Sequence, residues 1–308
     1  MKLKEEFVKR SKKLLGNEAE KYFKMLEKPL TSALRVNTLK ISPSKLKERL
    51  ENNGFRLRPV PWCAEGFRVD SGPEKLGNTL EHFLGYYYLQ EPASMIPPLL
   101  MELKEGQRIL DMAASPGSKT GQIAGLINDE GLIIANDVRI DRVSILKYNL
   151  QRMGVRSVVI TRRDGKSYKN LPEFFDRVLL DAPCSGEGVI RKNPYVAVQW
   201  NEHKLIRFAK EQKKLILSAY EALKPGGILV YSTCSLAPEE NEEVINFLLE
   251  HTNAKVMPAR LKGLKAREGV TAWRYKMRPS IKNCGRIYPQ DNDTEGFFVA
   301  KIMKEEGK

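Results

Sequence analysis

Two cysteines stand directly after predicted strands, and they are the side chains best suited to covalent chemistry. Cys184 lies in the segment DAPCSG and Cys234 in the segment STCS. In a sheet of parallel strands both would lie at the same edge, at the carboxyl ends of neighbouring strands. A single cysteine is most often a buried packing residue. A pair at adjacent strand ends, one of them beside Asp181, favours a reactive pair instead.

A thiol pair of this kind suits methylation of carbon 5 of cytosine. Carbon 5 is a poor nucleophile, but addition of a thiolate to carbon 6 makes the ring an enamine whose carbon 5 can attack a sulfonium methyl group. A base must then remove the carbon 5 proton so that the adduct eliminates. An acidic group near ring nitrogen 3 would assist, and Asp181 and Lys119 are candidates. Methylation of an exocyclic amino group would favour an aromatic residue at position 184, so Cys184 argues against it.

Acidic residues end four predicted strands, namely Asp111, Asp137, Asp164 and Asp181. Each alone could be a helix cap or a turn residue. Four at one edge of a sheet indicate a ligand site. Asp137 could accept hydrogen bonds from both hydroxyls of a ribose, and Asp164 ends the strand where an adenine would lie.

The segment DMAASPGSKTGQ, which ends the first of these strands and begins the next helix, indicates which class of nucleotide-like cofactor would bind. Gly117 allows close approach of the backbone to a ligand where the next helix begins. A P-loop is excluded because Lys119 follows Ser118 rather than a glycine, and the G-x-G-x-x-G pattern is absent. S-adenosylmethionine, which carries no phosphate, remains the expected cofactor.

From Arg108 onward, strands alternate with helices, which predicts βαβ units and an α/β fold with a mostly parallel, doubly wound sheet. The expected strands are 108–114, 132–138, 155–164, 176–184, 226–234 and 297–302, and the expected helices are 119–127, 141–154, 202–223 and 238–251.

The first third of the chain predicts a smaller unit. An amphipathic helix is expected over 4–27, ending before Pro29. Short strands at 33–40, 55–60 and 67–70 surround a helix with Ser42 as its N-cap and Pro43 at its first position. We therefore expect a small α+β module with its N-terminal helix over residues 1–90, followed by a methyltransferase domain over 91–308.

Composition points to the partner and the compartment. The formal net charge is +14 at pH 7, which favours a polyanion such as nucleic acid, although a solvated charged surface is the alternative. No apolar stretch predicts a membrane span, and the charged N-terminus MKLKEEFVKRSKKLL has no secretory apolar region, so we expect a cytoplasmic protein. The spacing of the four cysteines and three histidines predicts neither a metal site nor a disulfide framework.

Six motifs together resemble one family. The segments ALRVNTLK, YYYLQEPAS, DMAASPGSKT, DAPCSGEGVIRKNP, YSTCSLAPEENE and DTEGFFVAK are similar to those of the NOL/NOP/Sun RNA (cytosine-5) methyltransferases, from about Ser32 to Lys301. The resemblance implies a class I, Rossmann-like methyltransferase domain preceded by a small RNA-recognition-like module. One departure is S-P-G-S-K where A-P-G-G-K is common, and Ser118 still offers a backbone amide there.

The resemblance also implies roles for individual residues. Cys234 would attack carbon 6 and Cys184 would assist release, although DNA cytosine methylases use the cysteine of the PC motif as nucleophile. Asp181 would lie close to cofactor and cytosine, with Lys119 beside it. The expected cofactor-binding residues are Ala113, Ala114, Ser115, Pro116, Gly117, Ser118, Lys119, Asp137, Arg142, Asp164 and Asp181.

The expected partner is RNA, with tRNA favoured because the compact layout resembles archaeal-type tRNA enzymes. Ribosomal RNA is the close alternative, and a monomer is expected. A different class, an RNA-binding assembly factor with incidental methylation, would predict a degraded cysteine pair or cofactor motif, and neither motif is degraded. Three consecutive tyrosines, Tyr86 to Tyr88, could stack on bases, but packing within a strand is the favoured interpretation.

Overall fold

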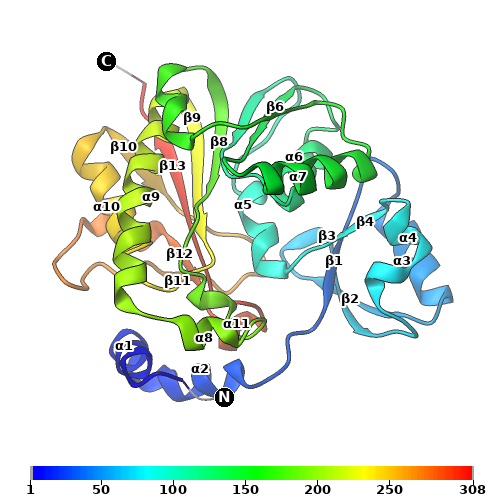
Figure 1. The fold of residues 1–308 in the computed structure, drawn as a ribbon, viewed down its shortest axis with the longest axis horizontal. Coiled ribbons are helices and arrows are strands. Elements are labelled where there is room, and N and C mark those ends of the chain that lie inside the picture. Colours follow the sequence, from blue (N-terminus) through cyan, green and yellow to red (C-terminus); the bar gives the residue numbers. More distant parts are fainter. Residues whose placement is uncertain (1–2, 307–308) are drawn as a thin grey trace.

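The computed structural model describes residues 3–306 and contains two sheets (Figure 1). The larger has nine strands in the order β11-β12-β13-β9-β8-β5-β6-β7, with β10 also paired to β13. Its parallel strands are β5 (Arg108–Asp111), β6 (Leu132–Asn136), β7 (Val158–Thr161), β8 (Phe175–Asp181) and β9 (Leu223–Thr233). The antiparallel strands are β10 (Ala254–Met257), β11 (Arg267–Glu268), β12 (Gly285–Ile287) and β13 (Phe297–Lys304).

The α/β class and the parallel strands are therefore as predicted, and so is the last strand at the C-terminus. The sheet is more mixed than expected, because β10, β11 and β12 add an antiparallel side. These strands are four residues long or shorter, so their sequences carry no recognisable alternation.

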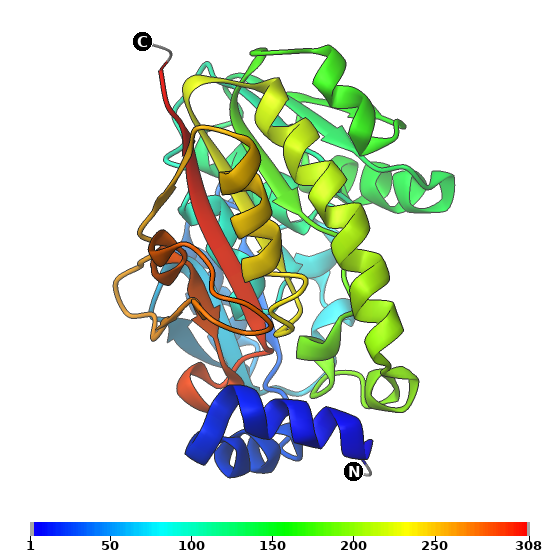
Figure 2. The ribbon, with the colours of Figure 1, turned by 90° about the vertical axis from the view of Figure 1, so that its left-hand side faces the viewer.

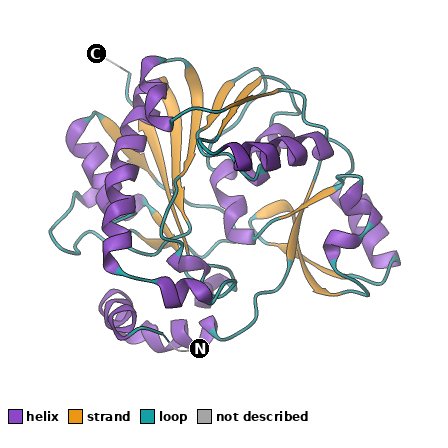
Figure 3. Cartoon of the chain, in the orientation of Figure 1, coloured by secondary structure: helices purple, strands orange, loops and turns teal. Residues whose placement is uncertain are grey.

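Helices cover both faces of this sheet (Figure 3). Alternate residues of each central strand face opposite sides. Leu110 and Val178 pack with α9 (Glu202–Ala222) and α10 (Glu242–His251), whereas Ile109 and Leu179 pack with α5 (Ile96–Leu99) and α6 (Ser118–Leu126). The next helix along the chain is α7 (Ile140–Met153), and it packs near β6 through Leu146 and Leu150. The remaining short helices are α4 (Leu80–Phe83), α8 (Tyr195–Gln199) and α11 (Pro289–Asn292).

The smaller sheet is antiparallel, in the order β2-β3-β1-β4, and belongs to the predicted α+β module. It comprises β1 (Ala33–Val36), β2 (Arg56–Val60), β3 (Cys63–Ser71) and β4 (Tyr87–Leu89), with α3 (Pro43–Asn52) packed on it. The Ser42 side chain accepts a hydrogen bond from the Lys45 backbone amide, as an N-cap should. Tyr87 is fully buried in β4 and Tyr88 nearly so, which confirms packing within a strand as the role of these two tyrosines.

Two sequence-based helix boundaries are wrong. The helix expected over 4–27 is two helices, α1 (Glu5–Leu15) and α2 (Ala19–Leu26), because the chain turns at Gly16, where φ is +54°. The helix expected from Pro238 begins only at Glu242, and the four preceding residues form a buried turn. Helices α1 and α2 lie across the bottom of the molecule in Figure 2, against residues of the larger part of the chain. No helix within residues 3–306 is long and apolar enough to span a membrane.

Candidate active site

The two strand-end cysteines lie side by side. Strands β8 and β9 run parallel, with Asp181 opposite Ser232, so the loops that follow them leave the sheet together. Cys184 Sγ and Cys234 Sγ are 3.1 Å apart and both side chains are partly buried. The hydrogen bond with Cys234, together with burial, raises the pKa of Cys184 well above its usual range. The raised pKa favours the protonated form of Cys184, and either sulfur can be the donor in the hydrogen bond between the two thiols.

Lys119 and Asp181 form an ion pair beside the cysteines. Lys119 Nζ lies 2.6 Å from Asp181 Oδ2, and Ser232 Oγ donates to the other carboxylate oxygen at 2.7 Å. Burial disfavours the charge of Lys119, but the adjacent Asp181 outweighs burial and raises the Lys119 pKa. The pair thus places a full ammonium and a hydrogen-bonded carboxylate at the same edge as the two thiols.

The predicted cofactor segment turns tightly at the start of α6. Gly117 has φ of +101° and caps α6, and a Cβ there would lie 3.0 Å from Leu146. Ser115 is tied to α7, because its hydroxyl donates to the Arg142 carbonyl and the Arg142 guanidinium donates to the Ser115 carbonyl. Pro116 is exposed and Ala114 buried, so the segment presents backbone rather than bulky side chains.

Asp137, at the end of β6, provides the test of whether a ribose fits. Its side chain is buried, and Oδ2 has no hydrogen-bond donor, although Arg142 Nε lies 3.4 Å away. A buried carboxylate oxygen without a donor is costly. Ribose hydroxyls would satisfy it, so the residues present fit the adenosine part of S-adenosylmethionine.

The other two acidic residues at strand ends, Asp111 and Asp164, differ from each other in burial. Asp111 is fully buried and accepts a hydrogen bond from Thr120 Oγ1, and burial raises its pKa to about 7. Asp164 is exposed, and its side chain caps a short 3-10 helix by accepting from the Lys166 amide. Asp111 therefore braces the start of α6 from inside, whereas Asp164 stands at the open end of the site.

Three polar residues of this site were missed by sequence reasoning. Ser94 accepts a hydrogen bond from Lys119 Nζ at 2.9 Å, and Glu91 holds the Ser94 turn by accepting from the amides of Ala93 and Ser94. Burial raises the pKa of Glu91 to about 7. The third, Glu240, bridges the loop after β8, which carries Cys184, and the loop after β9, which carries Cys234; these are the two cysteine loops. The segments QEPAS and PEENE contained these residues, but their spacing along the chain did not indicate which loops they join.

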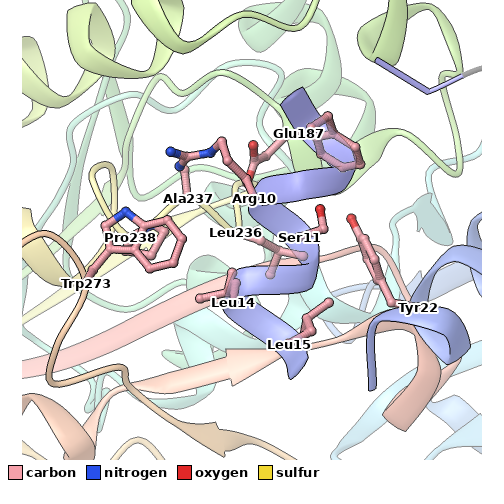
Figure 4. A pocket seen from close by; sticks show the side chains of 11 residues that line it. Arg10, Ser11, Leu14, Leu15, Tyr22, Glu187, Leu236, Ala237, Pro238 and Trp273 are labelled. Atoms are coloured by element: carbon pink, nitrogen blue, oxygen red, sulfur yellow. The ribbon is translucent and has the colours of Figure 1, made fainter. Parts of the chain in front are cut away.

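Behind the cysteine loops, α1 encloses a small cavity of about 20 Å³ (Figure 4). Glu187 and Arg10 line it, as do residues 236–238 of the loop that follows Cys234. Arg10 Nη2 lies 2.7 Å from Glu239 Oε2, and Glu187 accepts from Trp200 Nε1 at 2.8 Å. The cavity is thus lined by α1 and by residues that follow each of the two cysteines, and it has room for little more than a water molecule. Among residues 3–306 no group of three or more potential metal ligands occurs.

Comparison with known proteins identifies relatives over the whole length. Residues 98–303 match the family described as 16S rRNA methyltransferase RsmB/F, and residues 3–92 match the N-terminal domain of 16S rRNA methyltransferase RsmF. The tRNA (cytosine(49)-C(5))-methyltransferase of Pyrococcus abyssi is 47% identical, with 99% of each chain covered. The ribosomal RNA small subunit methyltransferase F of Vibrio campbellii is 44% identical over 92% of this chain, but this chain spans only 59% of that protein.

Two solved structures share the fold over almost the whole chain. A methyltransferase homolog protein from Pyrococcus horikoshii has a TM-score of 0.86 and 40% identity, covering 97% of this chain and 94% of its own. The structure of NSun6 from Pyrococcus horikoshii with SFG has a TM-score of 0.85 and 26% identity, covering 99% of both.

Proposed function

Because the chain belongs to the RsmB/F family of RNA (cytosine-5) methyltransferases, which use S-adenosylmethionine, we propose that its substrate is tRNA. The observation that carries this is the extent of the match. The relative named as a tRNA enzyme is 47% identical, with 99% of each chain covered. The enzyme acts as a cytoplasmic monomer in this proposal, with residues 1–90 and 91–308 as its two units.

The cofactor would lie along the edge formed by β5, β6 and α6. Residues 113–119 and Arg142 would line its methionine and ribose, Asp137 would hold the ribose hydroxyls, and Asp164 would lie near the adenine. Asp181 would lie between cofactor and cytosine. When bound, S-adenosylmethionine supplies an electrophilic methyl group on a sulfonium.

Cys234 is the proposed nucleophile. Its thiolate adds to carbon 6 of cytosine, and the new carbon–sulfur bond makes carbon 5 electron-rich. The Lys119–Asp181 pair would lie at ring nitrogen 3, where the Lys119 ammonium supplies the acidic hydrogen and positive charge that stabilise the charge developing there, and Asp181 holds Lys119 in place. After methylation, loss of the carbon 5 proton allows the bond to Cys234 to break. A base takes that proton, its electron pair re-forms the ring double bond, and Cys234 leaves as a thiolate; Cys184, whose sulfur lies 3.1 Å from that of Cys234, is proposed to assist this release.

Two cysteine variants test this division of roles. Cys234→Ala should abolish both methyl transfer and any covalent RNA adduct. Cys184→Ala should still transfer the methyl group but stall before elimination, leaving a protein–RNA adduct on denaturing electrophoresis. An adduct trapped by Cys234→Ala and lost in Cys184→Ala would reverse the roles. Full activity of both variants, without adduct, would remove the covalent mechanism.

The substrate is tested separately, by bisulfite sequencing of total RNA from cells with and without the gene. We expect a tRNA cytosine to lose its protection from conversion when the gene is absent. Loss of protection confined to small-subunit rRNA would favour the second candidate, for which the 44% identity to the Vibrio protein argues.

A further inference from the structure

Glu240 is a fully buried carboxylate that the proposed chemistry does not use, and it lies between the two cysteine loops. Its Oε2 accepts from the backbone amide of Ser185 at 2.8 Å, and its Oε1 accepts from Ser235 Oγ at 2.9 Å. Ser185 directly follows Cys184, and Ser235 directly follows Cys234. The Glu240 side chain is therefore hydrogen-bonded to the residue that follows each cysteine.

A third donor links this carboxylate to the first cysteine loop again. Gln212 Nε2, from α9, lies 3.0 Å from Glu240 Oε2 and 2.8 Å from the Pro183 carbonyl oxygen. The Glu240 backbone is held too, because Tyr231 OH on β9 donates to its carbonyl oxygen at 2.6 Å. Both loops, α9 and β9 thus converge on one residue.

The partners of Glu240 differ from those of the glutamates around it. Three neighbours are each paired with an arginine: Glu239 with Arg10, Glu242 with Arg286 and Glu243 with Arg274. Glu240 instead accepts from a backbone amide, a hydroxyl and a side-chain amide. A buried charge costs stability unless it is well hydrogen-bonded, and burial raises the Glu240 pKa. Bonds to charged acceptors are short and directional, which suits a residue whose task is to fix distances.

We propose that Glu240 is a positioning residue that holds the two cysteine loops at the spacing at which Cys184 and Cys234 act as a pair. The proposal rests on the proposed covalent mechanism. The 3.1 Å separation of the two sulfurs is the quantity that Glu240 sets. Because misplacement of reacting groups by about 1 Å costs roughly 100-fold in rate, loosening the bridge should act on turnover.

Glu240→Ala and Glu240→Gln separate positioning from charge. Alanine removes the bridge. Glutamine keeps it, because its oxygen can accept from Ser185 and its amide can donate to Ser235 Oγ. We expect kcat on tRNA to fall about 100-fold in the alanine variant, with KM for S-adenosylmethionine unchanged and most activity retained in the glutamine variant. Glu243→Gln is the matched control, since Glu243 is a buried glutamate nearby that pairs with Arg274 rather than with the cysteine loops.

A second readout needs neither RNA nor cofactor. Diamide oxidises two adjacent thiols to a disulfide and takes up their two protons and two electrons. The rate of Cys184–Cys234 disulfide formation, followed by peptide mass spectrometry, reports the spacing of the loops. It should fall about tenfold or more in Glu240→Ala and stay near wild type in Glu240→Gln and Glu243→Gln. Should Glu240→Ala fail to fold, Ser235→Ala removes one arm of the bridge and should slow oxidation in the same direction.

The two readouts distinguish failure of this proposal from failure of the proposed function. Equal rates of disulfide formation in wild type and in Glu240→Ala would overturn the positioning role, whatever the substrate. A glutamine variant as inactive as the alanine variant, with wild-type oxidation, would also overturn it by showing that the carboxylate itself takes part in the reaction. If the wild-type protein forms the Cys184–Cys234 disulfide rapidly but does not methylate tRNA, the positioning role of Glu240 stands and the proposal of tRNA as substrate is refuted.

Discussion

At the scale of single residues, the site is distinguished by buried carboxylates, and in two of them, Asp111 and Asp137, one oxygen has no hydrogen-bond donor. Asp137 has one oxygen that no donor satisfies, and the pKa values of Asp111, Glu91 and Glu187 are all raised to about 7, mainly by burial. Such groups destabilise the fold when they ionise. They are retained at the sheet edge, where ligands bind, and behind the cysteine loops.

Asp137→Ala should weaken binding of S-adenosylmethionine by about 1–3 kcal/mol, because it removes charge-assisted hydrogen bonds to the ribose. Isothermal titration calorimetry measures this directly. The control is Asp141→Ala, since Asp141 is an exposed carboxylate on α7 that pairs with Arg139. Equal affinity of wild type and Asp137→Ala would place the ribose elsewhere.

Glu187 predicts a pH dependence of stability. Its pKa is about 7 in the folded state, against an ordinary value of 4.5, so the folded protein binds this proton more tightly than the unfolded chain. The stabilising contribution of the neutral acid is complete below pH 4.5 and is lost as the pH rises to about 7. The loss amounts to about 3 kcal/mol.

Glu187→Gln cannot ionise, and its oxygen can still accept from Trp200 Nε1. Its stability relative to wild type should therefore rise between about pH 4.5 and pH 7, as measured by urea unfolding across that range. A stability difference that does not change with pH would show that Glu187 does not titrate in this window.

At the scale of elements, α1 is the one most distant in sequence from the loops it supports. Arg10 is 19% exposed and pairs with Glu239, which is 1% exposed, and the Arg10 guanidinium also lies over the Trp273 ring (Figure 4). Phe7 packs edge-on against Trp200. Helix α1 is therefore attached to the larger part of the chain by one nearly buried ion pair and an aromatic cluster.

Arg10→Ala should lower the free energy of unfolding by about 3 kcal/mol, because it leaves the Glu239 carboxylate buried without its cation. Lys9→Ala is the control, since the Lys9–Glu5 pair is highly exposed and should cost less than about 0.5 kcal/mol. Guanidinium chloride denaturation compares the two, and hydrogen exchange of the α1 amides locates the effect. Similar losses in both variants would mean that the Arg10–Glu239 pair does not hold α1.

At the scale of the whole molecule, the net charge of +14 dominates encounters with RNA. Each phosphate contacted by a lysine or arginine releases condensed counterions, so the logarithm of RNA affinity should fall steeply and linearly with the logarithm of salt concentration. Fluorescence anisotropy with a tRNA transcript between low and physiological salt measures the slope. An affinity that stays flat over this range would refute binding through the phosphate backbone.

The sequence by itself determined the α/β class, the parallel strands and the motifs DAPCSG and STCS at strand ends. It could do so because apolar runs and turn residues are local signals, and because parallel strands bring their carboxyl ends to one edge. Ser42 as a helix cap and Tyr87 as a packing residue were likewise readable from neighbouring residues.

Only the tertiary structure decided which distant segments meet. It brought Ser94 to Lys119 and Glu240 to both cysteine loops, and it added β10, β11 and β12 to the sheet. These features depend on contacts between residues far apart in the chain. No local periodicity encodes such contacts, because a buried hydrogen bond forms only where packing brings its donor and acceptor together.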